Sequence, residues 1–140
     1  MRLEPLYRLT FAYRENHGSA DERLLLAEGS CEGRLEGRFR AANRARRTRA
    51  GTWLPDLHGA VETADGGTVL VHVSGRGRPD EGRVVGAATH TTGDERYAWL
   101  NDVVGAVAGE VFPGDRVVLD VSALVWEPLG ERPGYDPGER

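Results

Sequence analysis

Asp56 and His58 stand two residues apart in a segment whose composition is typical of a β-strand. Side chains two apart on a strand lie on the same side of the pleat, so the carboxylate could orient the imidazole. A histidine held in this way can serve as a general base near neutral pH. We therefore predict that His58 and Asp56 are catalytic and face the interior of the protein. The alternative is a histidine at the end of a hairpin that binds a backbone group.

His72 and Glu62 could join this pair, depending on the turn that connects the two strands. A two-residue turn at 65–66 places His58 and His72 on opposite faces of the hairpin. A three-residue turn at 65–67 instead places His58, Glu62 and His72 on one face. That second register is compatible with a His/His/Glu metal site. Our prediction is nevertheless that the protein uses no metal and no other cofactor, and that His72 and Glu62 contact a ligand.

Large aromatic and polar side chains supply further candidates for ligand binding. Trp53 and Trp99 offer broad apolar surfaces with one donor each, and either could line a cavity. Asn101 shares a face with Trp99 in an extended chain and would need a partner inside. Arg47 could reach over the mouth of a barrel and hold a ligand carboxylate. For Trp126 we predict a place in the core.

The elements that must position these residues are strands. Alternation of apolar and polar residues with a period of two runs through 7–13, 31–40, 53–63, 68–74, 84–92 and 117–126. Residues 97–111 fit both a strand and a helix, and we favour a strand because Gly105 and Gly109 disfavour a helix. About eight strands joined by short turns predict an all-β, antiparallel, lipocalin-like barrel. Such a barrel can hold one small ligand.

Composition narrows the class of protein. The chain has 140 residues, which favours one domain; we predict a barrel over 1–127 and a disordered tail over 128–140. There is no lysine, which excludes Schiff-base chemistry, and a single cysteine, which excludes an intrachain disulfide. We see no signal peptide and no apolar stretch long enough to span a membrane, and so expect a cytoplasmic protein without a membrane partner.

Arginines are numerous, and seven of them fall between Arg34 and Arg49. Such a run could bind phosphates. However, the net charge of the chain is −4, and no aromatic residues separate the arginines from Arg44 to Arg49. A chain without lysine also uses arginine wherever a surface cation is needed. We therefore predict no nucleic-acid partner.

Several motifs resemble the domain of unknown function 3237 family. They are the segments 53–59 (WLPDLHG), 62–67 (ETADGG) and 92–101 (TGDERYAWLN), supported by 3–7 and 33–37. The resemblance covers roughly residues 1–127 and implies an eight-stranded lipocalin-like barrel in a small bacterial protein of unassigned function. His58 stands where many relatives carry arginine, and His90-Thr91 replaces a phenylalanine–glutamate pair. These departures suggest a different ligand if those positions line the pocket.

Two functions are compatible with this sequence. The first, which we slightly favour because of Asp56 and His58, is a cofactor-independent enzyme. It would convert a small organic molecule in the barrel by acid–base chemistry, as a cyclase, isomerase or lyase. The alternative is a carrier that binds such a molecule without reaction. A third hypothesis is a structural module with a solid core, which predicts no cavity. A homodimer is compatible with all three.

Overall fold

The computed structural model describes residues 1–130, and 68% of the structure is β-strand. The strands are β1 (Arg2–Gly18), β2 (Glu22–Gly33), β3 (Gly37–Arg47), β4 (Trp53–Leu54), β5 (Asp56–Thr63), β6 (Thr68–Arg78), β7 (Arg83–Thr91), β8 (Gly105–Phe112) and β9 (Arg116–Val125). Two 3-10 helices, η1 (Pro79–Glu81) and η2 (Glu95–Asp102), interrupt them. Neither helix in this part of the chain has the length and apolar character of a membrane span.

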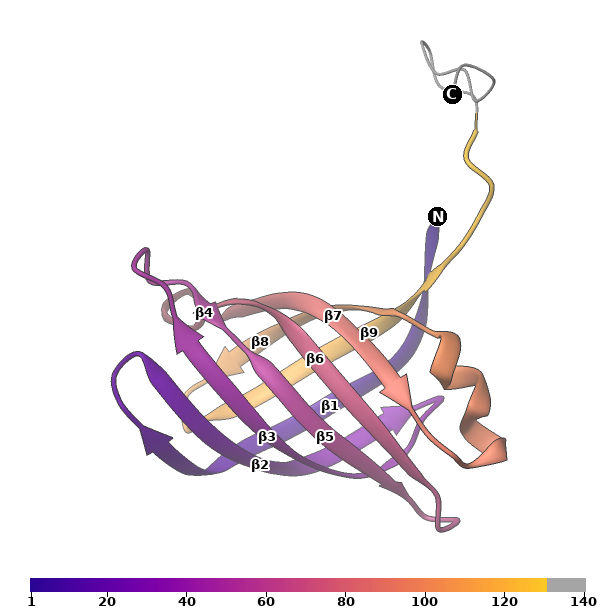
Figure 1. Ribbon diagram of the computed structural model, residues 1–140, viewed down its shortest axis with the longest axis horizontal. Coiled ribbons are helices and arrows are strands. Elements are labelled where there is room, and N and C mark those ends of the chain that lie inside the picture. The colour runs from indigo at the N-terminus through magenta and orange to yellow at the C-terminus, as the bar shows by residue number, and fades with distance from the viewer. Residues whose placement is uncertain (131–140) are drawn as a thin grey trace.

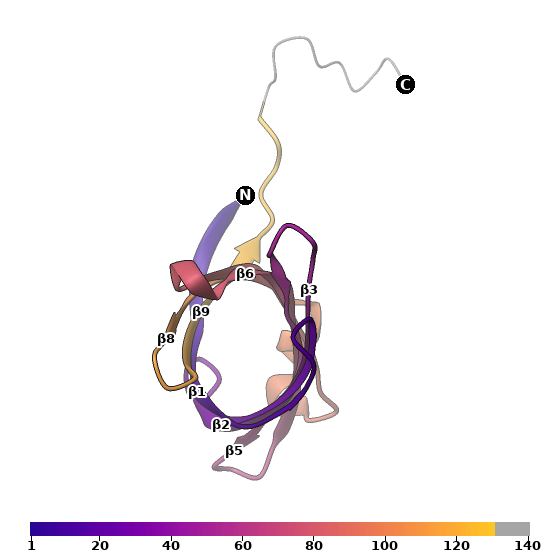
Figure 2. The same cartoon turned by 90° about the vertical axis from the view of Figure 1, so that its left-hand side faces the viewer.

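The strands form one closed antiparallel barrel of eight strands (Figure 1). The short β4 continues the line of β5 between β3 and β6. Neighbours in sequence pair with each other, and β1 pairs with β9 to close the ring. Viewed from one end, the strands surround a common axis (Figure 2). Closure leaves no long edge strand unpaired, which removes a template for aggregation. The predicted barrel is confirmed.

One face of every strand points into the barrel and supplies the core. On β1 the inward residues are Tyr7, Leu9 and Phe11, as the alternation predicts. Phe39 of β3 is fully buried, and its ring packs against Phe11 with centroids 5.5 Å apart. Gly59 on the adjacent β5 makes room for this ring, because a Cβ there would lie 2.5 Å from Cε1 of Phe39. The outward faces carry most of the charged residues, including the Arg8–Asp120 pair between β1 and β9.

The two ends of the barrel differ. At one end, which we call the closed end, η2 packs against the core and buries Leu100 completely (Figure 1). The opposite end, which we call the open end, is formed by the connections at 19–21, 48–52, 79–82 and 113–115. The prediction of a continuous strand over 97–111 is therefore wrong for its first half. The side chain of Asp94 caps η2 by accepting a hydrogen bond from the backbone N–H of Arg96, and β8 begins only at Gly105.

The β5–β6 hairpin has a register that neither predicted turn describes. The backbone N–H of Thr63 donates to the carbonyl of Gly67, so the turn consists of residues 64–66. Gly66 has a φ of +87°, a conformation that glycine adopts without strain. His58 consequently lies directly opposite His72. The two histidines share a face, as the longer of the two predicted turns would also have placed them.

Trp126 does not lie in the core, and this prediction is wrong. It follows β9 beyond the last ladder pair and is 80% exposed. The alternation of β9 continues in the sequence after the barrel wall has ended, so periodicity alone does not reveal the loss of burial. Of the tail predicted to be disordered, residues 131–140 lie outside the described part of the chain.

Candidate functional site

The open end of the barrel contains a cavity of about 280 Å³. Its wall is mainly apolar, with side chains from all nine strands. Phe11, Leu57, Val73, Val117 and Leu119 form the floor, and Trp53 and Pro55 stand nearer the mouth. A mostly apolar pocket with a few polar groups is the usual form of a small-molecule site. The predicted internal space therefore exists, and Trp53 lines it as expected.

Tyr13 and Asn43 place a polar pair in the wall of this cavity. The amide of Asn43 donates to the hydroxyl oxygen of Tyr13 at 2.9 Å, and its carbonyl oxygen accepts the backbone N–H of Asp56 at 2.9 Å. These two bonds fix the buried amide. They also leave the hydroxyl hydrogen of Tyr13 without an acceptor among residues 1–130. Burial raises the pKa of Tyr13, so near neutral pH this hydroxyl is a donor.

Arg23 supplies a cation at the same mouth. Its guanidinium donates to the side-chain oxygen of Asn16 at 3.1 Å and lies 5.9 Å from the centre of the Trp53 ring. Within the described residues it forms no ion pair with an acidic side chain. Arg47, the predicted ligand for a carboxylate, is instead paired with Asp21 at 2.7 Å. Its guanidinium stands over Trp53 at 5.8 Å but is not part of the cavity wall.

Asp115 adds a carboxylate at the rim. It follows Pro113 and Gly114 in the β8–β9 turn and adopts a positive φ of 60°. Its backbone carbonyl accepts the N–H of Tyr13 at 3.0 Å, which ties this turn to β1. The carboxylate also contributes, after burial, to the raised pKa of Tyr13. The cavity thus combines a phenol, an amide, a guanidinium and a carboxylate around an apolar interior.

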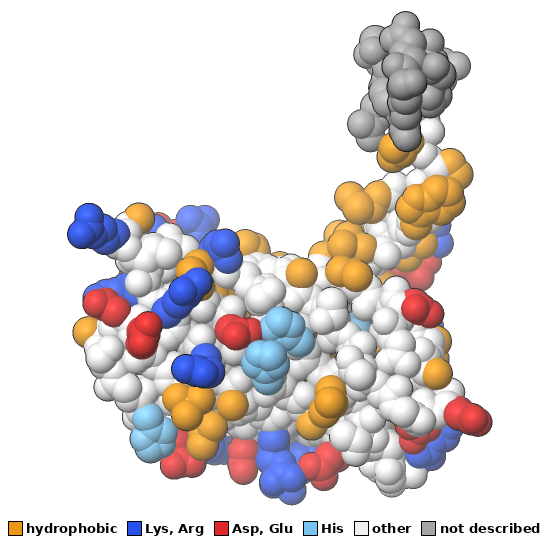
Figure 3. Space-filling view, viewed as in Figure 1, with side chains coloured by type: hydrophobic (Ala, Val, Ile, Leu, Met, Phe, Trp, Pro, Cys, Tyr) orange, Lys and Arg blue, Asp and Glu red, His pale blue; other side chains and the backbone are white. Residues whose placement is uncertain are grey.

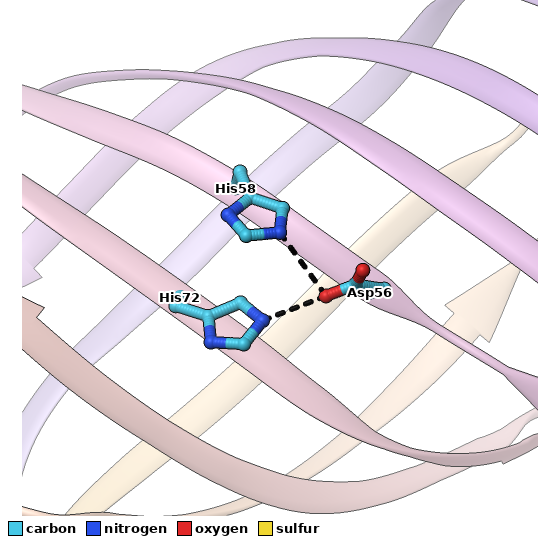
Figure 4. A group of neighbouring side chains, drawn as sticks. All are labelled: Asp56, His58 and His72. Atoms are coloured by element: carbon cyan, nitrogen blue, oxygen red, sulfur yellow. Dashed lines mark hydrogen bonds and ion pairs between the residues drawn. The ribbon is translucent and has the colours of Figure 1, made fainter.

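Asp56 and His58 do not face this cavity, and the predicted inward orientation is wrong. They lie on the outer wall with His72, on neighbouring strands (Figure 4). Nε2 of His72 is 2.6 Å and Nε2 of His58 is 3.2 Å from the same oxygen of Asp56. The histidine rings stack with centroids 4.3 Å apart. Histidine and acidic side chains lie together on this exposed face in Figure 3.

The charge of Asp56 is stabilised by these neighbours. The hydrogen bond from His72 is the main cause of a pKa below the ordinary value of the carboxyl group, with a smaller contribution from His58. The side chain of His58 is 63% exposed, so it has no access to a ligand in the barrel. Asp56 and His58 therefore cannot act on a ligand inside the barrel.

Three other predicted ligand contacts also lie outside the cavity. Glu62 is on the outer wall and forms an ion pair with Arg40 at 2.7 Å. Trp99 belongs to η2 and lies under the guanidinium of Arg34 at 4.4 Å. Asn101 is exposed, and its side chain exchanges two hydrogen bonds with the backbone of Thr92. The bonds of Asn101 hold the loop before η2 in place, which is a structural role.

A buried pair near the closed end joins Tyr7 to His90, a residue at which the sequence departs from the pattern of the family it resembles. The hydroxyl of Tyr7 is 2.7 Å from Nε2 of His90, and Nδ1 of His90 is 3.0 Å from the carbonyl of Val103. Burial raises the pKa of Tyr7 and lowers that of His90. Both bonds are satisfied when Tyr7 donates to Nε2 and the Nδ1–H of a neutral His90 donates to Val103.

This pair makes the fold sensitive to acid. Because the pKa of His90 in the folded state lies below its ordinary value of 6.5, the unfolded chain takes up this proton more readily. The stabilisation is fully present above pH 6.5 and declines as the pH falls toward the folded-state value. We expect denaturation by urea at pH 7.5 and pH 5.5 to show this decline. A His90→Gln variant should lose less stability over the same interval, and an equal loss would contradict this role for His90.

Comparisons with known proteins agree with this class of fold, a closed antiparallel barrel. No family model and no curated protein matches the chain. Among solved structures, a protein of unknown function from Rhodopseudomonas palustris aligns with a TM-score of 0.78 at 18% identity, over 89% of this chain and 97% of that one. A β-barrel-like protein from Acinetobacter baumannii gives 0.73 at 19%, over 87% and 94%. A protein described as an enzyme from Penicillium herquei gives 0.62 at 22%, over 86% and 93%. At these identities the likeness establishes the fold.

Proposed function

We propose that this protein binds a small organic molecule with an apolar ring system and an anionic oxygen in the cavity at the open end. The observation that carries the proposal is the wall of that cavity. It is apolar over most of its surface but contains the Tyr13 hydroxyl and the Arg23 guanidinium. Both are donors, and the carbonyl, carboxylate or phenolate oxygen of a ligand is the matching acceptor.

The geometry supports a defined orientation of the ligand. Trp53 and Phe11 offer flat apolar surfaces that can cover a ring, and Leu57 adds an aliphatic contact. Arg23 and Tyr13 then bind the polar end of the molecule. Asn43 acts as a positioning residue, because it holds the phenol of Tyr13 without facing a substrate atom that must react.

A pair of nearly isosteric probes tests the charge preference. We expect 2-naphthoate to bind more tightly than 2-naphthamide when each is titrated by calorimetry. Replacing Arg23 with Gln should weaken 2-naphthoate binding by about 10-fold, because a hydrogen bond to a charged group is lost at a partly exposed site. The affinity for 2-naphthamide should hardly change. If both probes lose affinity equally, or if neither binds, the assigned role of Arg23 is wrong.

Catalysis by acid–base chemistry is the second candidate, now placed in the cavity and not at His58. Tyr13 could donate a proton to a ligand oxygen, and Asp115 could accept a proton from a ligand carbon or hydroxyl group. The position of this carboxylate on a residue with positive φ favours the idea, since unusual backbone conformations often accompany functional sites. The likeness to the Penicillium herquei enzyme also supports it. An isomerisation or ring closure would need no added cofactor.

A comparison of variants separates the carrier from the enzyme. For the enzyme, Tyr13→Phe and Asp115→Asn should each lower kcat by at least about 100-fold, in addition to any change in KM. For the carrier, the same variants change affinity only. Membership of the domain of unknown function 3237 family and a bacterial origin remain predictions from the motifs, and a cytoplasmic location remains a prediction from the sequence as a whole.

A further inference from the structure

We propose that Asp56, His58 and His72 form a binding site for a divalent transition-metal ion of the zinc type on the outer wall of the barrel. The ligand atoms of these three residues all lie within 4.8 Å of one another. The site is separate from the proposed ligand cavity, since Leu57, between Asp56 and His58 in sequence, points to the opposite face of β5.

The backbone brings the three residues together in a fixed way. Asp56 and His58 are two apart on β5 and therefore share its outer face. His72 is the residue on β6 that lies directly opposite His58 in the ladder. Each of these strands is hydrogen-bonded on both sides, β5 by β3 and β6, and β6 by β5 and β7. The three Cα positions thus stand on a rigid wall, which favours a preformed site.

The distances are close to those of a coordinated ion. Ligand atoms about 2.0 Å from a tetrahedral zinc ion are separated from each other by about 3.3 Å. Nε2 of His58 already lies 3.2 Å from Oδ1 of Asp56. Nε2 of His72 is 2.6 Å from that oxygen and would have to retreat by roughly 0.7 Å as the ion replaces the hydrogen bond. His72 is partly exposed, so a change of its side-chain torsions can supply this movement.

Coordination requires a change of tautomer at His72, because its Nε2 now donates a hydrogen to the carboxylate of Asp56. To bind an ion, each imidazole must present Nε2 without its hydrogen and carry that hydrogen on Nδ1. Among residues 1–130, neither Nδ1 atom has a hydrogen bond that fixes it in another state. Both rings also reach solvent, which gives an ion a direct path to the site.

The types of ligand indicate which ion would bind. Two imidazoles and one carboxylate suit zinc, cobalt and nickel, whereas magnesium and calcium prefer oxygen ligands. One negative charge on Asp56 offsets part of the charge of a divalent ion. Three protein ligands leave at least one coordination position for water or another molecule, as in zinc sites that are not purely structural. The adjacent shallow groove beside His58 and His72, with Thr89 and Thr91, leaves room for that molecule.

The test is a metal titration of the full-length protein after removal of any affinity tag and treatment with a chelator. We expect Zn²⁺ to bind with a stoichiometry of one in calorimetry, and Co²⁺ to give the visible absorption of a low-symmetry nitrogen–oxygen site. His58→Ala and His72→Ala should each weaken Zn²⁺ binding by at least about 10-fold. His17→Ala is the matched control, because Nε2 of His17 also lies near a carboxylate, Glu15, at 3.3 Å, yet has no second histidine beside it.

A second measurement guards against variants that fold poorly. An ion that binds only the folded protein raises its melting temperature, and with Zn²⁺ at about 100 times its Kd we expect a rise of roughly 5–10 °C. The two alanine variants should lose this rise while keeping the melting temperature of the metal-free protein. The proposal is overturned if Zn²⁺ binding does not saturate, or if the alanine variants bind as tightly as the His17 control. Neither outcome affects the cavity ligand, whose binding involves different residues.

Discussion

Replacing Ala45 with phenylalanine is expected to abolish binding of 2-naphthoate. Ala45 lies on the inward face of β3, is only 6% exposed and forms part of the cavity wall next to Arg23, its ladder partner on β2. A benzyl group at this position would project into the 280 Å³ cavity and occupy the place of a ligand ring. We expect the affinity for 2-naphthoate to fall by at least about 100-fold in a calorimetric titration, which corresponds to roughly 2.8 kcal/mol.

The fold should tolerate this substitution, because the new ring enters an existing space and does not displace packed side chains. Ala87→Phe is the matched control: Ala87 is exposed on the outer face of β7, so the same added ring should leave binding unchanged. Unchanged binding in Ala45→Phe, with a melting temperature close to that of the wild type, would mean that the ligand binds elsewhere.

Replacing Phe39 with alanine is expected to give the largest loss of stability. Phe39 has no exposed surface, and it fills the middle of the barrel against Phe11 and over Gly59. Removing a buried phenylalanine ring usually costs about 3–5 kcal/mol, because apolar contacts are lost and a cavity remains. For a domain of this size we expect the melting temperature to fall by roughly 10–15 °C in calorimetry.

Leu70→Ala provides the comparison for Phe39. Leu70 is also a large apolar side chain on a barrel strand, but it points outward and is 53% exposed. Its truncation should change the free energy of unfolding by no more than about 0.5 kcal/mol. Similar losses in the two variants would contradict the inward and outward assignment of the strands.

The barrel could be predicted because the apolar residues of its inward faces recur in the sequence with a period of two. Tyr7, Leu9 and Phe11 in β1, and Val117, Leu119 and Val121 in β9, are apolar at alternate positions and are all buried. Each of these strands needs a partner on both sides, and short turns allow neighbours in sequence to pair. Closure of the ring by β1 and β9 follows from this order of strands.

The face of the Asp56–His58 pair could have been predicted from its neighbours. Leu57 and Val61 are apolar and share the inward face of β5, so Asp56 and His58, at the alternate positions, must face outward. The pairing of His58 with His72, in contrast, depends on where the turn closes. Asp65, Gly66 and Gly67 can form several turns, and the hydrogen bond from Thr63 to Gly67 selects one of them through contacts that the sequence does not display.

The prediction of one strand over 97–111 is wrong because the glycines used as evidence lie outside the helix. Gly105 and Gly109 weigh against a helix, but both belong to β8, after the helix has ended. The helical spacing of Tyr97 and Leu100 was the correct signal for η2, where both pack on the core. The range 97–111 contains most of a helix and most of a strand, so one assignment for the whole range could not describe both.

The polar residues of the cavity differ in how clearly the sequence indicates them. Asn43 follows Phe39 and Ala41 at the same phase of β3, and a polar residue on an apolar face indicates a buried hydrogen-bonded site. Arg23 lies at the same phase of β2 as the buried Ala27 and Cys31, but as one of 18 arginines it does not stand out in the sequence. Asp115 is placed by a turn whose conformation depends on Gly114 and on the bond to Tyr13.

The most direct test of the proposed function is a crystal structure of the protein soaked with 2-naphthoate. We predict difference density for the naphthyl ring inside the open end, between Phe11, Trp53 and Leu57, with the carboxylate within hydrogen-bonding distance of Arg23 or Tyr13. Density for the ligand only on the outer wall, or an open end filled by the protein's own side chains, would contradict the account.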